Sequence, residues 1–357
     1  AESERPYIYA GGGVVQSNAS EELMLLAERL DCPVGTSMMG LTCIPRSSPR
    51  NLGMTGMHGA YAASKVLSMS DLIIAIGTRF SDRATGNKQA YSLGRKVLHI
   101  DIDAAEIGKN IRVDAAIVGD VKHVLTQLLN ADVKRRPSDW ADQVDKVRTA
   151  PDSNRHMPPG ELNPQSVIEA VNARLRPDDV VATDVGQHQL WTAQYYAFEQ
   201  PRTLVTSGGL GTMGFGMGAA IGACLARGKA RTVLFTSDGS FHMNLQEMAT
   251  AVSNRLPLLV VLLNNCTLGM VRQWQTLFYD CRYSNTTLNR QTDFVALADA
   301  FGAKGFRAKD MTGFMASLDA ALALDTPALI DVVIDTDQKV LPMIPPGGTI
   351  DDIILKG

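Results

Sequence analysis

The sequence predicts an α/β protein made of two doubly wound, Rossmann-like parallel-sheet domains. Short apolar runs alternate with helical segments through both halves of the chain, the pattern of sheets covered by helices on both faces. A stretch rich in charge and proline, residues 132–160, separates the halves. The length of 357 residues exceeds one ordinary domain and is sufficient for two buried cores.

The first half begins with an expected strand over Tyr7–Ala10, which leads into Gly11-Gly12-Gly13. Ser20 is the expected N-cap of a helix over Glu21–Leu30, because acidic residues follow it in the first turn. The other elements expected here are buried strands over Asp71–Ile76 and Lys96–Ile100 and a helix over Val121–Leu129. We expect this first domain to cover residues 1–135.

A linker is expected over residues 136–162, and the basic run Lys134-Arg135-Arg136-Pro137 at its start is interpreted as solvated chain. The second domain, over 163–357, begins at Asn163-Pro164, an N-cap followed by proline at the first helical position. Its expected elements are strands over Val180–Thr183, Thr203–Val205, Thr232–Thr236, Leu258–Leu263 and Ala328–Ile334, and a helix over Asn244–Asn254.

The composition, 45% hydrophobic and 20% charged, is typical of a soluble globular protein. The net charge of -3 gives no electrostatic reason to expect nucleic acid or a membrane surface as a partner. No apolar run reaches transmembrane length, and no signal peptide stands at the start. The five cysteines show no CxxC pairing, which favours reduced thiols and a cytoplasmic location. Because the chain begins at Ala1, we expect a processed or excised product.

Asp238-Gly239-Ser240 and Asn264-Asn265 are the most informative residues of the chain. Each group follows a predicted strand, and a right-handed crossover sets Asp238 beside Asn265 at the carboxyl ends of neighbouring parallel strands. Carboxylate and amide oxygens are the ligands that Mg²⁺ combines with phosphate oxygens. Gly239 and Ser240 offer backbone N–H groups and a hydroxyl to the same phosphate. Asp-Gly-Ser alone would be only a turn; the paired asparagine favours a metal–diphosphate site.

Further motifs surround this pair: Val185-Gly186-Gln187-His188-Gln189, Gly208–Gly214, Leu268–Gln275 and Pro342–Gly347. Together they resemble the thiamine diphosphate fingerprint, and more narrowly the catalytic subunit of the acetohydroxyacid synthase (acetolactate synthase) family. The resemblance extends through Gly77–Arg83 and Asp101-Ile102-Asp103, but it covers the middle and C-terminal domains only. It implies a transferase that decarboxylates pyruvate and joins it to pyruvate or 2-ketobutyrate, in the biosynthesis of isoleucine, valine and leucine.

The resemblance also implies roles for residues of the second domain. The residues implied to bind thiamine diphosphate are Gln187, His188, Gly211, Met213, Gly239, Ser240, Gly269 and Met270. The implied metal ligands are Asp238, Asn265 and the main-chain carbonyl of Thr267, and the implied catalytic residues are Met213, Met270 and Trp274. Without the resemblance, the glycine-rich stretch reads equally as helix packing, and Met270 with Trp274, four residues apart, as a buried stripe.

In the first domain the resemblance implies two stretches that bind FAD as a structural group, since the net reaction is not a redox reaction. The residues are His58, Gly77, Thr78, Arg79, Asp82, Arg83, Asp101, Ile102 and Asp120. Without the resemblance, these charges read equally as a surface salt-bridge cluster. Gly11-Gly12-Gly13 is not a GxGxxG motif and is weak evidence by itself.

The resemblance further implies a homodimer or tetramer and leaves room for a regulatory small subunit. The glutamate that activates the thiamine ring lies in the family's amino-terminal domain, so we expect this chain alone to lack activity. Glyoxylate carboligase and sulfoacetaldehyde acetyltransferase are alternatives, and Arg272–Gln275 and Pro345-Pro346-Gly347 argue against both. A non-catalytic fragment that binds cofactor or another subunit also stays open.

Overall fold

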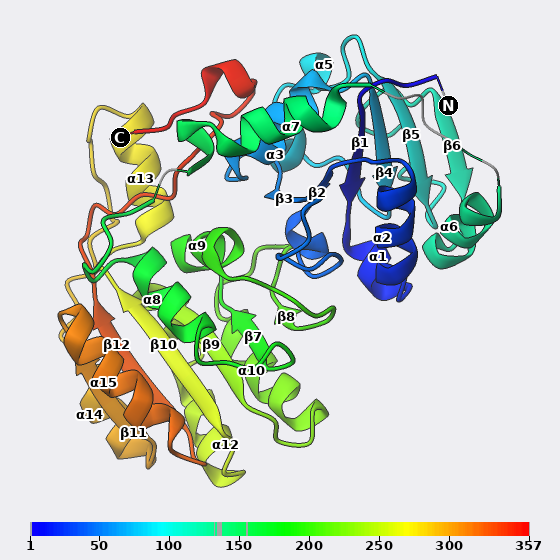
Figure 1. Ribbon diagram of the computed structural model, residues 1–357. Coiled ribbons are helices and arrows are strands. Elements are labelled where there is room, and N and C mark those ends of the chain that lie inside the picture. The colour runs from blue at the N-terminus through cyan, green and yellow to red at the C-terminus, as the bar shows by residue number, and fades with distance from the viewer. Residues whose placement is uncertain (1, 132, 134–137, 155, 357) are drawn as a thin grey trace. The chain divides into compact units, whose positions relative to one another are not determined.

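The computed structural model describes residues 2–131, 133, 138–154 and 156–356. These form two compact units (Figure 1). Unit 1 comprises Ala1–Arg155, Ala197–Arg202 and Leu341–Lys356; unit 2 comprises His156–Tyr196 and Thr203–Val340. Both are α/β with a parallel sheet, which confirms the predicted fold class. The predicted bounds 1–135, 136–162 and 163–357 stay a prediction, and Lys134–Pro137 lie outside the described residues.

Unit 1 is built on a six-stranded sheet in the order β3-β2-β1-β4-β5-β6, with each strand parallel to its neighbours. The strands are β1 Pro6–Ala10, β2 Val34–Thr36, β3 Asn51–Met54, β4 Leu72–Ile76, β5 Lys96–Asp101 and β6 Ala115–Val118. The chain proceeds from β1 to β3 in one direction and then returns to β4 on the other side of β1. The strand order therefore reverses between β1 and β4.

Helices cover both faces of this sheet, so the strands are apolar on both sides. Ile8 and Ala10 of β1 belong to the core under α2 and α6, whereas Tyr7 and Tyr9 belong to a second core under α3 and α7. Trp140 lies in the second core, and its Nε1 donates to the Pro6 carbonyl over 2.9 Å. The helices are α1 Gly12–Gln16, α2 Ser20–Arg29, α3 Tyr61–Met69, α4 Asp82–Thr85, α5 Lys88–Tyr91, α6 Val121–Asn130 and α7 Trp140–Thr149, with short 3-10 turns at Met38–Gly40 and Pro151–Asn154.

The segment Leu341–Lys356 belongs to unit 1 although it is distant in sequence. The Ile344 N–H donates to the Met57 carbonyl over 2.8 Å, and the Asn87 N–H donates to the Gly348 carbonyl over 3.0 Å. Within the segment a 3-10 turn at Ile350–Asp352, with a capping box made by Thr349, brings Ile354 back to pair with Met343. These bonds make the segment an integral part of unit 1.

Unit 2 has a six-stranded sheet in the order β11-β12-β10-β9-β7-β8, again parallel throughout. The strands are β7 Val180–Thr183, β8 Leu204–Val205, β9 Thr232–Ser237, β10 Leu258–Asn264, β11 Lys304–Ala308 and β12 Ala328–Val333. From β7 the chain first adds β8 on one side and then β9 on the other. The strand order therefore reverses between β7 and β9.

Both faces of this sheet are also covered. Leu258, Val260 and Leu262 of β10 lie in a core with α10, α12 and α14, and the alternate residues of β10 are buried on the opposite face. The helices are α8 Pro164–Asn172, α9 Gln187–Tyr195, α10 Phe215–Ala226, α11 Asp238–Phe241, α12 Met248–Ser253, α13 Gly269–Phe278, α14 Phe294–Phe301 and α15 Met311–Leu322, with a 3-10 turn at Leu245–Glu247.

Local predictions were confirmed where the signal was strong and wrong at two helix starts. Asn163 caps α8 by accepting from the Ser166 N–H, as predicted. Ser20 is wrong as an N-cap, because the cap position is Ala19 and α2 has no side-chain cap. The helix predicted over Asn244–Asn254 is shorter: a separate α11 follows β9, and Asn244 bonds across to the Gly214 carbonyl, so α12 begins only at Met248.

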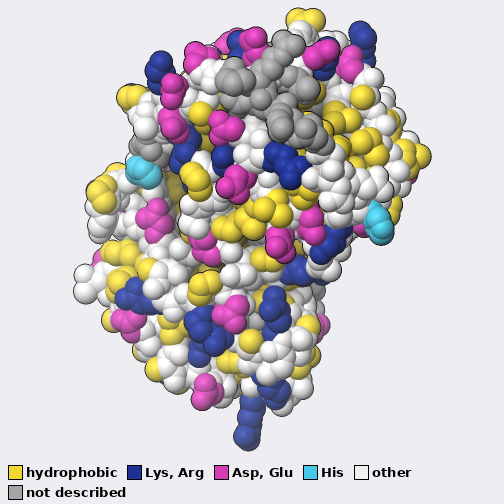
Figure 2. Space-filling view, turned by 45° about the vertical axis from the view of Figure 1, so that its right-hand side comes forward, with side chains coloured by type: hydrophobic (Ala, Val, Ile, Leu, Met, Phe, Trp, Pro, Cys, Tyr) yellow, Lys and Arg dark blue, Asp and Glu magenta, His cyan; other side chains and the backbone are white. Residues whose placement is uncertain are grey.

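The distribution of surface charges and the state of the cysteines agree with what the composition predicted. On the face shown in Figure 2, acidic, basic and apolar side chains are interspersed, in keeping with a net charge of -3. All five cysteines are free thiols. In the described part of the chain, no helix has both the length and the apolar character needed to cross a membrane.

Candidate functional site

The strand reversal in unit 2 brings the predicted site residues to one edge of the sheet. Gln187 and His188 follow β7, Asp238 follows β9 directly, and Asn265 follows β10. Because β7, β9 and β10 are adjacent and parallel, their carboxyl ends meet at this edge. Ligands of open α/β sheets bind at such a reversal point. The predicted proximity of Asp238 and Asn265 therefore agrees with the strand order.

Asp238 is a buried carboxylate whose charge is poorly compensated. The residue is 4% exposed, and its Oδ1 has no hydrogen-bond partner among the described residues. Burial raises the pKa of Asp238 to about 6, although backbone N–H groups and Arg290 oppose the shift. A divalent cation would supply the missing positive charge. The residue therefore fits a magnesium ligand.

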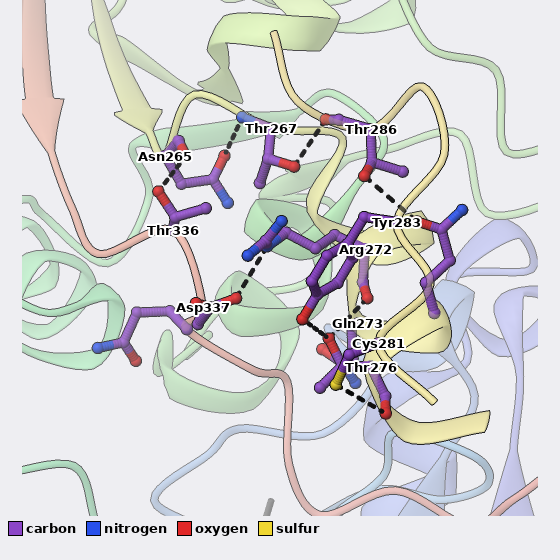
Figure 3. A network of polar contacts seen from close by, with 12 residues as sticks. Asn265, Thr267, Arg272, Gln273, Thr276, Cys281, Tyr283, Thr286, Thr336 and Asp337 are labelled. Atoms are coloured by element: carbon purple, nitrogen blue, oxygen red, sulfur yellow. Dashed lines mark hydrogen bonds and ion pairs between the residues drawn. The ribbon is translucent and has the colours of Figure 1, made fainter. Parts of the chain in front are cut away.

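Asn265 and Thr267 are held in place by hydrogen bonds on both sides (Figure 3). The Thr336 hydroxyl donates to the Asn265 carbonyl over 3.0 Å, and the Thr267 N–H donates to Asn265 Oδ1 over 3.3 Å. The Thr267 hydroxyl donates to the Thr286 carbonyl over 2.7 Å. Between the two residues Cys266 has a φ of 55°, which turns the chain sharply. Both predicted ligands thus lie in a braced turn.

Gln187 connects the turn after β7 to the turn after β10. Its Oε1 accepts from Asn265 Nδ2 over 3.1 Å, and its Nε2 donates to Gln273 Oε1 and to the Gln338 carbonyl. Any side chain at Gly269 would collide with it, because a Cβ there would lie 1.9 Å from Gln187 Oε1. The predicted cofactor residues Gln187 and Gly269 therefore also have a structural role.

Helix α13 is held by contacts with the chain after β12 and with the loop that follows α13 itself. Arg272 bonds to Asp337 over 2.8 Å and stacks over the Tyr283 ring at 3.9 Å from its centroid (Figure 3). The Thr276 hydroxyl contacts the Tyr283 hydroxyl at 3.2 Å. A stacked and ion-paired arginine of this kind fixes α13 in orientation.

His188 is fully buried and neutral. It is 1% exposed, and burial lowers its pKa to about 3, so it carries no charge at neutral pH. Its Nε2 has no hydrogen-bond partner in the described part of the chain. An unsatisfied ring nitrogen beside the site is available to a polar ligand.

The glycine-rich segment precedes α10 and is anchored by Asp184. Gly211 has a φ of 63° and Gly214 a φ of 89°, conformations that glycine adopts at little cost. Asp184 Oδ1 accepts from the Gly214 N–H over 2.9 Å, and Oδ2 accepts from the Gly216 N–H over 3.0 Å. Burial raises the pKa of Asp184 in spite of these bonds. The predicted cofactor residue Met213 lies in this anchored segment and is half-buried.

Met270 and Trp274 lie on α13, on which Gln273 is the buried residue. Both side chains are half-buried, and the Trp274 ring packs edge-on against Phe278 with centroids 5.5 Å apart. They therefore do not form the fully buried stripe that one interpretation of the sequence offered. Their partial exposure leaves them accessible to a ligand.

Gly239 and Ser240 lie in α11, directly after Asp238. The Ser240 hydroxyl donates to the Val185 carbonyl over 2.7 Å, so its proton is engaged within the protein. A Cβ at Gly239 would lie 3.0 Å from the end of the Leu268 side chain, a tight contact that a small movement of Leu268 would relieve. The Asp238 carbonyl contacts His242 Nδ1 at 2.6 Å, which braces the turn.

The residues predicted to bind flavin all lie at or beyond the carboxyl ends of unit 1 strands. Those are His58 after β3, Gly77, Thr78 and Arg79 after β4, Asp82 and Arg83 in α4, Asp101 and Ile102 at the end of β5, and Asp120 after β6. Arg83 forms an ion pair with Asp82, and Asp120 caps α6 by accepting from the His123 N–H. Ile102 is 70% exposed.

Gly11-Gly12-Gly13 has a packing role at this edge. The Gly13 N–H donates to the Gly77 carbonyl over 2.9 Å, and a Cβ at Gly11 would lie 2.3 Å from the same oxygen. The triplet therefore lets the turn after β1 contact the turn after β4.

A cavity of about 380 Å³ lies elsewhere in unit 1, between α3, α5 and the Ile344–Asp351 segment. Its lining includes none of the residues predicted to bind flavin, so it gives no support to that prediction. Within residues 2–131, 133, 138–154 and 156–356, no group of three or more His, Cys, Asp or Glu side chains could hold a metal ion. A cation at Asp238 would thus need neutral oxygen ligands as well.

Sequence reasoning missed the residues that support the site from a distance: Asp184, Gln273, Thr336 and His242. The position of Asp184 directly after a predicted strand was a usable signal, because the site lies at that edge. The partners of Gln273 and Thr336 come from segments far along the chain, and no local pattern indicates them.

Two family descriptions match the chain. "Thiamine pyrophosphate enzyme, central domain" matches residues 1–128, and "Thiamine pyrophosphate enzyme, C-terminal TPP binding domain" matches residues 184–332. The two ranges contain the candidate residues at the carboxyl ends of the strands in unit 1 and unit 2.

Curated relatives match almost the whole chain. A "Probable acetolactate synthase large subunit" of Methanocaldococcus jannaschii is 43% identical over 364 residues, covering 99% of this chain and 61% of the relative. An "Acetolactate synthase" of Mycobacterium leprae is 43% identical, covering 99% of this chain and 58% of the relative. An "Acetolactate synthase large subunit" of Buchnera aphidicola from Acyrthosiphon pisum is 39% identical, covering 99% and 63%. The chain thus spans 58–63% of the length of these relatives.

Proposed function

Since the chain belongs to the thiamine pyrophosphate enzymes, whose central and C-terminal domains it carries, we propose that it is part of an acetolactate synthase large subunit. The proposed reaction joins the two-carbon unit of decarboxylated pyruvate to a second 2-ketoacid, pyruvate or 2-ketobutyrate. Similarity to relatives printed as acetolactate synthases, at 39–43% identity for the three described, supports this reaction over glyoxylate carboligation or sulfoacetaldehyde acetyl transfer.

The observation that carries the proposal is the buried, poorly compensated carboxylate of Asp238 at the strand reversal of unit 2. Its unpaired Oδ1 and raised pKa support the proposal of a cation beside it. Asn265, on the adjacent turn, offers a neutral oxygen, and the Thr267 carbonyl is proposed as a third ligand. One carboxylate and neutral oxygens suit Mg²⁺ that is also bound to a diphosphate.

The protein residues are proposed to bind and orient the cofactor. Bound thiamine diphosphate supplies the carbanion chemistry of the reaction. The neutral His188 is proposed to offer its Nε2 near the diphosphate, and α11 its Gly239 and Ser240 N–H groups to the same anion. Gln187, whose Nε2 donates within the protein, is proposed to line the same part of the site. The turn at Gly211 and the side chain of Met213 are proposed to contact the aminopyrimidine ring and support the bent shape of the cofactor.

Met270 and Trp274 are proposed to line the pocket of the acceptor ketoacid. Their half-buried positions on α13 support this, because α13 begins two residues after Thr267. An indole wall favours 2-ketobutyrate over pyruvate through contact with one more methylene, which is worth about 1–3 kcal/mol.

Unit 1 is proposed to bind FAD at its carboxyl edge as a structural group. Gly77, Thr78 and Arg79 follow the strand at the reversal point, Asp101 ends the next strand, β5, and Asp120 follows β6. The exposed Ile102 offers an apolar surface to a flat ring. These positions match the general rule for ligands of open α/β sheets.

The complete protein is proposed to act as a homodimer or tetramer in the cytoplasm, with a regulatory small subunit as a further partner. Five free thiols support a reducing compartment. The carboxylate that activates the thiamine ring is proposed to lie in the part of the relatives that this chain does not span. Glu247 is half-buried and accepts from the Thr250 hydroxyl, which supports a packing role for it.

Calorimetry of thiamine diphosphate with Mg²⁺ tests the proposal. Asp238→Ala is expected to abolish Mg²⁺-dependent binding, whereas Asp325→Ala, which removes an exposed carboxylate of unit 2, leaves it unchanged. Equal affinity of Asp238→Ala and the unsubstituted chain would refute the site. In the complete large subunit, turnover of glyoxylate or sulfoacetaldehyde in place of pyruvate would favour the alternatives.

A further inference from the structure

Asp184 lies at the junction between two segments to which the proposed function gives different roles. We propose that Asp184 is a positioning residue that couples the glycine-rich segment 208–214 to the metal-ligand segment 238–241. The inference rests on the proposed function, because these segments are assigned there to the two ends of thiamine diphosphate. Asp184 touches neither metal nor cofactor in this assignment; it acts through the residues that do.

The side chain of Asp184 holds the glycine-rich segment. It is 2% exposed, and its two oxygens accept three backbone N–H groups, from Val185 at 2.7 Å, Gly214 at 2.9 Å and Gly216 at 3.0 Å. Gly214 is the N-cap residue of the twelve-residue α10, so the carboxylate lies at the amino end of that helix. A negative charge there is favourable, and charged acceptors make the stronger hydrogen bonds.

The backbone next to Asp184 holds the metal-ligand segment. The Asp184 N–H donates to the Phe235 carbonyl over 3.0 Å, which joins the end of β7 to β9 three residues before Asp238. The Val185 carbonyl accepts from the Ser240 hydroxyl over 2.7 Å, two residues after Asp238. The segment that carries Asp238 is therefore bound to the 184–185 peptide on both sides.

The chain after Asp184 also leads directly to His188. The buried His188 lies in the first turn of α9, four residues after Asp184. A shift of the main chain at Asp184 would move Gly214 and Ser240 together, because both bond to the 184–185 segment. If Asp184 acted only as the cap of α10, its substitution would disturb only the first turn of that helix.

The junction leaves no space for adjustment. A Cβ at Gly216 would lie 2.8 Å from both the Cβ and the N atom of Asp184. By contrast, a Cβ at Gly222, in the same helix, would meet nothing within 4 Å. The two glycines therefore provide a matched pair of alanine substitutions, one of which presses on the junction.

Asp184→Asn is the direct test, because it keeps the shape and replaces one acceptor oxygen by a donor. The matched control is Asp179→Asn: Asp179 is 5% exposed, precedes the same strand at its opposite end, and bonds to Arg176. Both variants are expected to lower stability. Under conditions in which both are folded, only Asp184→Asn is expected to weaken thiamine diphosphate–Mg²⁺ binding, by about 10- to 100-fold, since a buried donor loses its acceptor.

Hydrogen exchange of the cofactor-free chain separates coupling from simple capping. Asp184→Asn is expected to speed exchange in peptides covering both 212–217 and 238–243. An increase confined to 212–217, or cofactor affinity equal to that of Asp179→Asn, would overturn the inference. Failure of the unsubstituted chain to bind cofactor would instead count against the proposed function, and the exchange measurement would still decide the coupling.

The Gly216→Ala and Gly222→Ala variants test the inference even if Asp184→Asn does not fold. Gly216→Ala is expected to weaken cofactor binding in the same direction and to speed exchange over 238–243. Gly222→Ala is expected to leave both unchanged and to stabilise the helix slightly. Equal behaviour of the two alanine variants would refute the role of the junction.

Discussion

Replacing Asp238 with asparagine is expected to stabilise the protein when no metal is present and to remove its stabilisation by cofactor. The residue has 4% exposure and an unpaired Oδ1, so its charge is costly in the metal-free state. Burial raises the pKa from 3.8 to about 6. At about 1.36 kcal/mol per pKa unit, the charged form costs about 3 kcal/mol well above pH 6.

The sign follows from the direction of the shift. Because the folded-state pKa lies above the unfolded value, the cost is absent below pH 3.8 and develops fully as the pH rises through about 6. Asparagine has no charge, but it buries an amide N–H₂ that lacks an acceptor, which costs about 1–2 kcal/mol. We therefore expect Asp238→Asn to gain about 1–2 kcal/mol at pH 8 and nearly nothing at pH 5.

The assay is urea unfolding in the presence of a chelator, followed by tryptophan fluorescence. Trp191 and Trp274 report on unit 2, and replacing Trp140 of unit 1 with phenylalanine in parent and variant removes the third signal. Saturating thiamine diphosphate and Mg²⁺ should reverse the order, since at 100 times Kd a ligand adds about 2.7 kcal/mol to a protein that binds it. Asp325→Asn, at an exposed position, is the control. A metal-free Asp238→Asn that is less stable than the parent at pH 8, by an amount independent of pH, would refute the reasoning.

Three further predictions concern the other proposed sites. Arg79→Ala should weaken FAD binding without changing thiamine diphosphate affinity, because the two sites lie in different units; equal flavin absorbance of the purified variant and parent would exclude this role. In the complete large subunit, Trp274→Leu should lower the preference for 2-ketobutyrate over pyruvate by about 10-fold, measured by product ratio in competition; an unchanged ratio would place the indole outside the acceptor pocket. The 357-residue chain alone should form no detectable acetolactate in a colorimetric acetoin assay, since general acid–base assistance is worth about 10²–10⁴-fold; robust turnover would show that the activating carboxylate lies within it.

The fold and the centre of the site were predictable because their signals are local. Asp238 and Asn265 belong to one strand–helix–strand unit, and the handedness of such units determines which strand ends meet. The long apolar strands β9 and β10 are recognisable from composition alone. Buried parallel strands of this kind can be predicted without information about the rest of the chain.

The remaining elements lacked such signals. β2 has only three residues with a central glycine, and β6 is a run of four apolar residues, Ala-Ala-Ile-Val, that stays mostly exposed. Both are too short to be recognised as strands from the sequence. β11 reads Lys-Gly-Phe-Arg-Ala and gains its place by pairing with β12. The contact of Asp184 with Gly214 joins residues 30 positions apart, and it depends on backbone angles that the sequence does not display.

The segment Leu341–Lys356 has a consequence for the order of events during biosynthesis. A ribosome delivers the chain from its amino terminus, so strands β1 to β6 emerge long before residues 341–356 exist. The carbonyl of Met57 and the N–H of Asn87 must therefore wait for Ile344 and Gly348, which arrive only after all of unit 2 has been made. Unit 1 emerges first yet is completed last, and a nascent chain halted at residue 340 would carry an unfinished first domain.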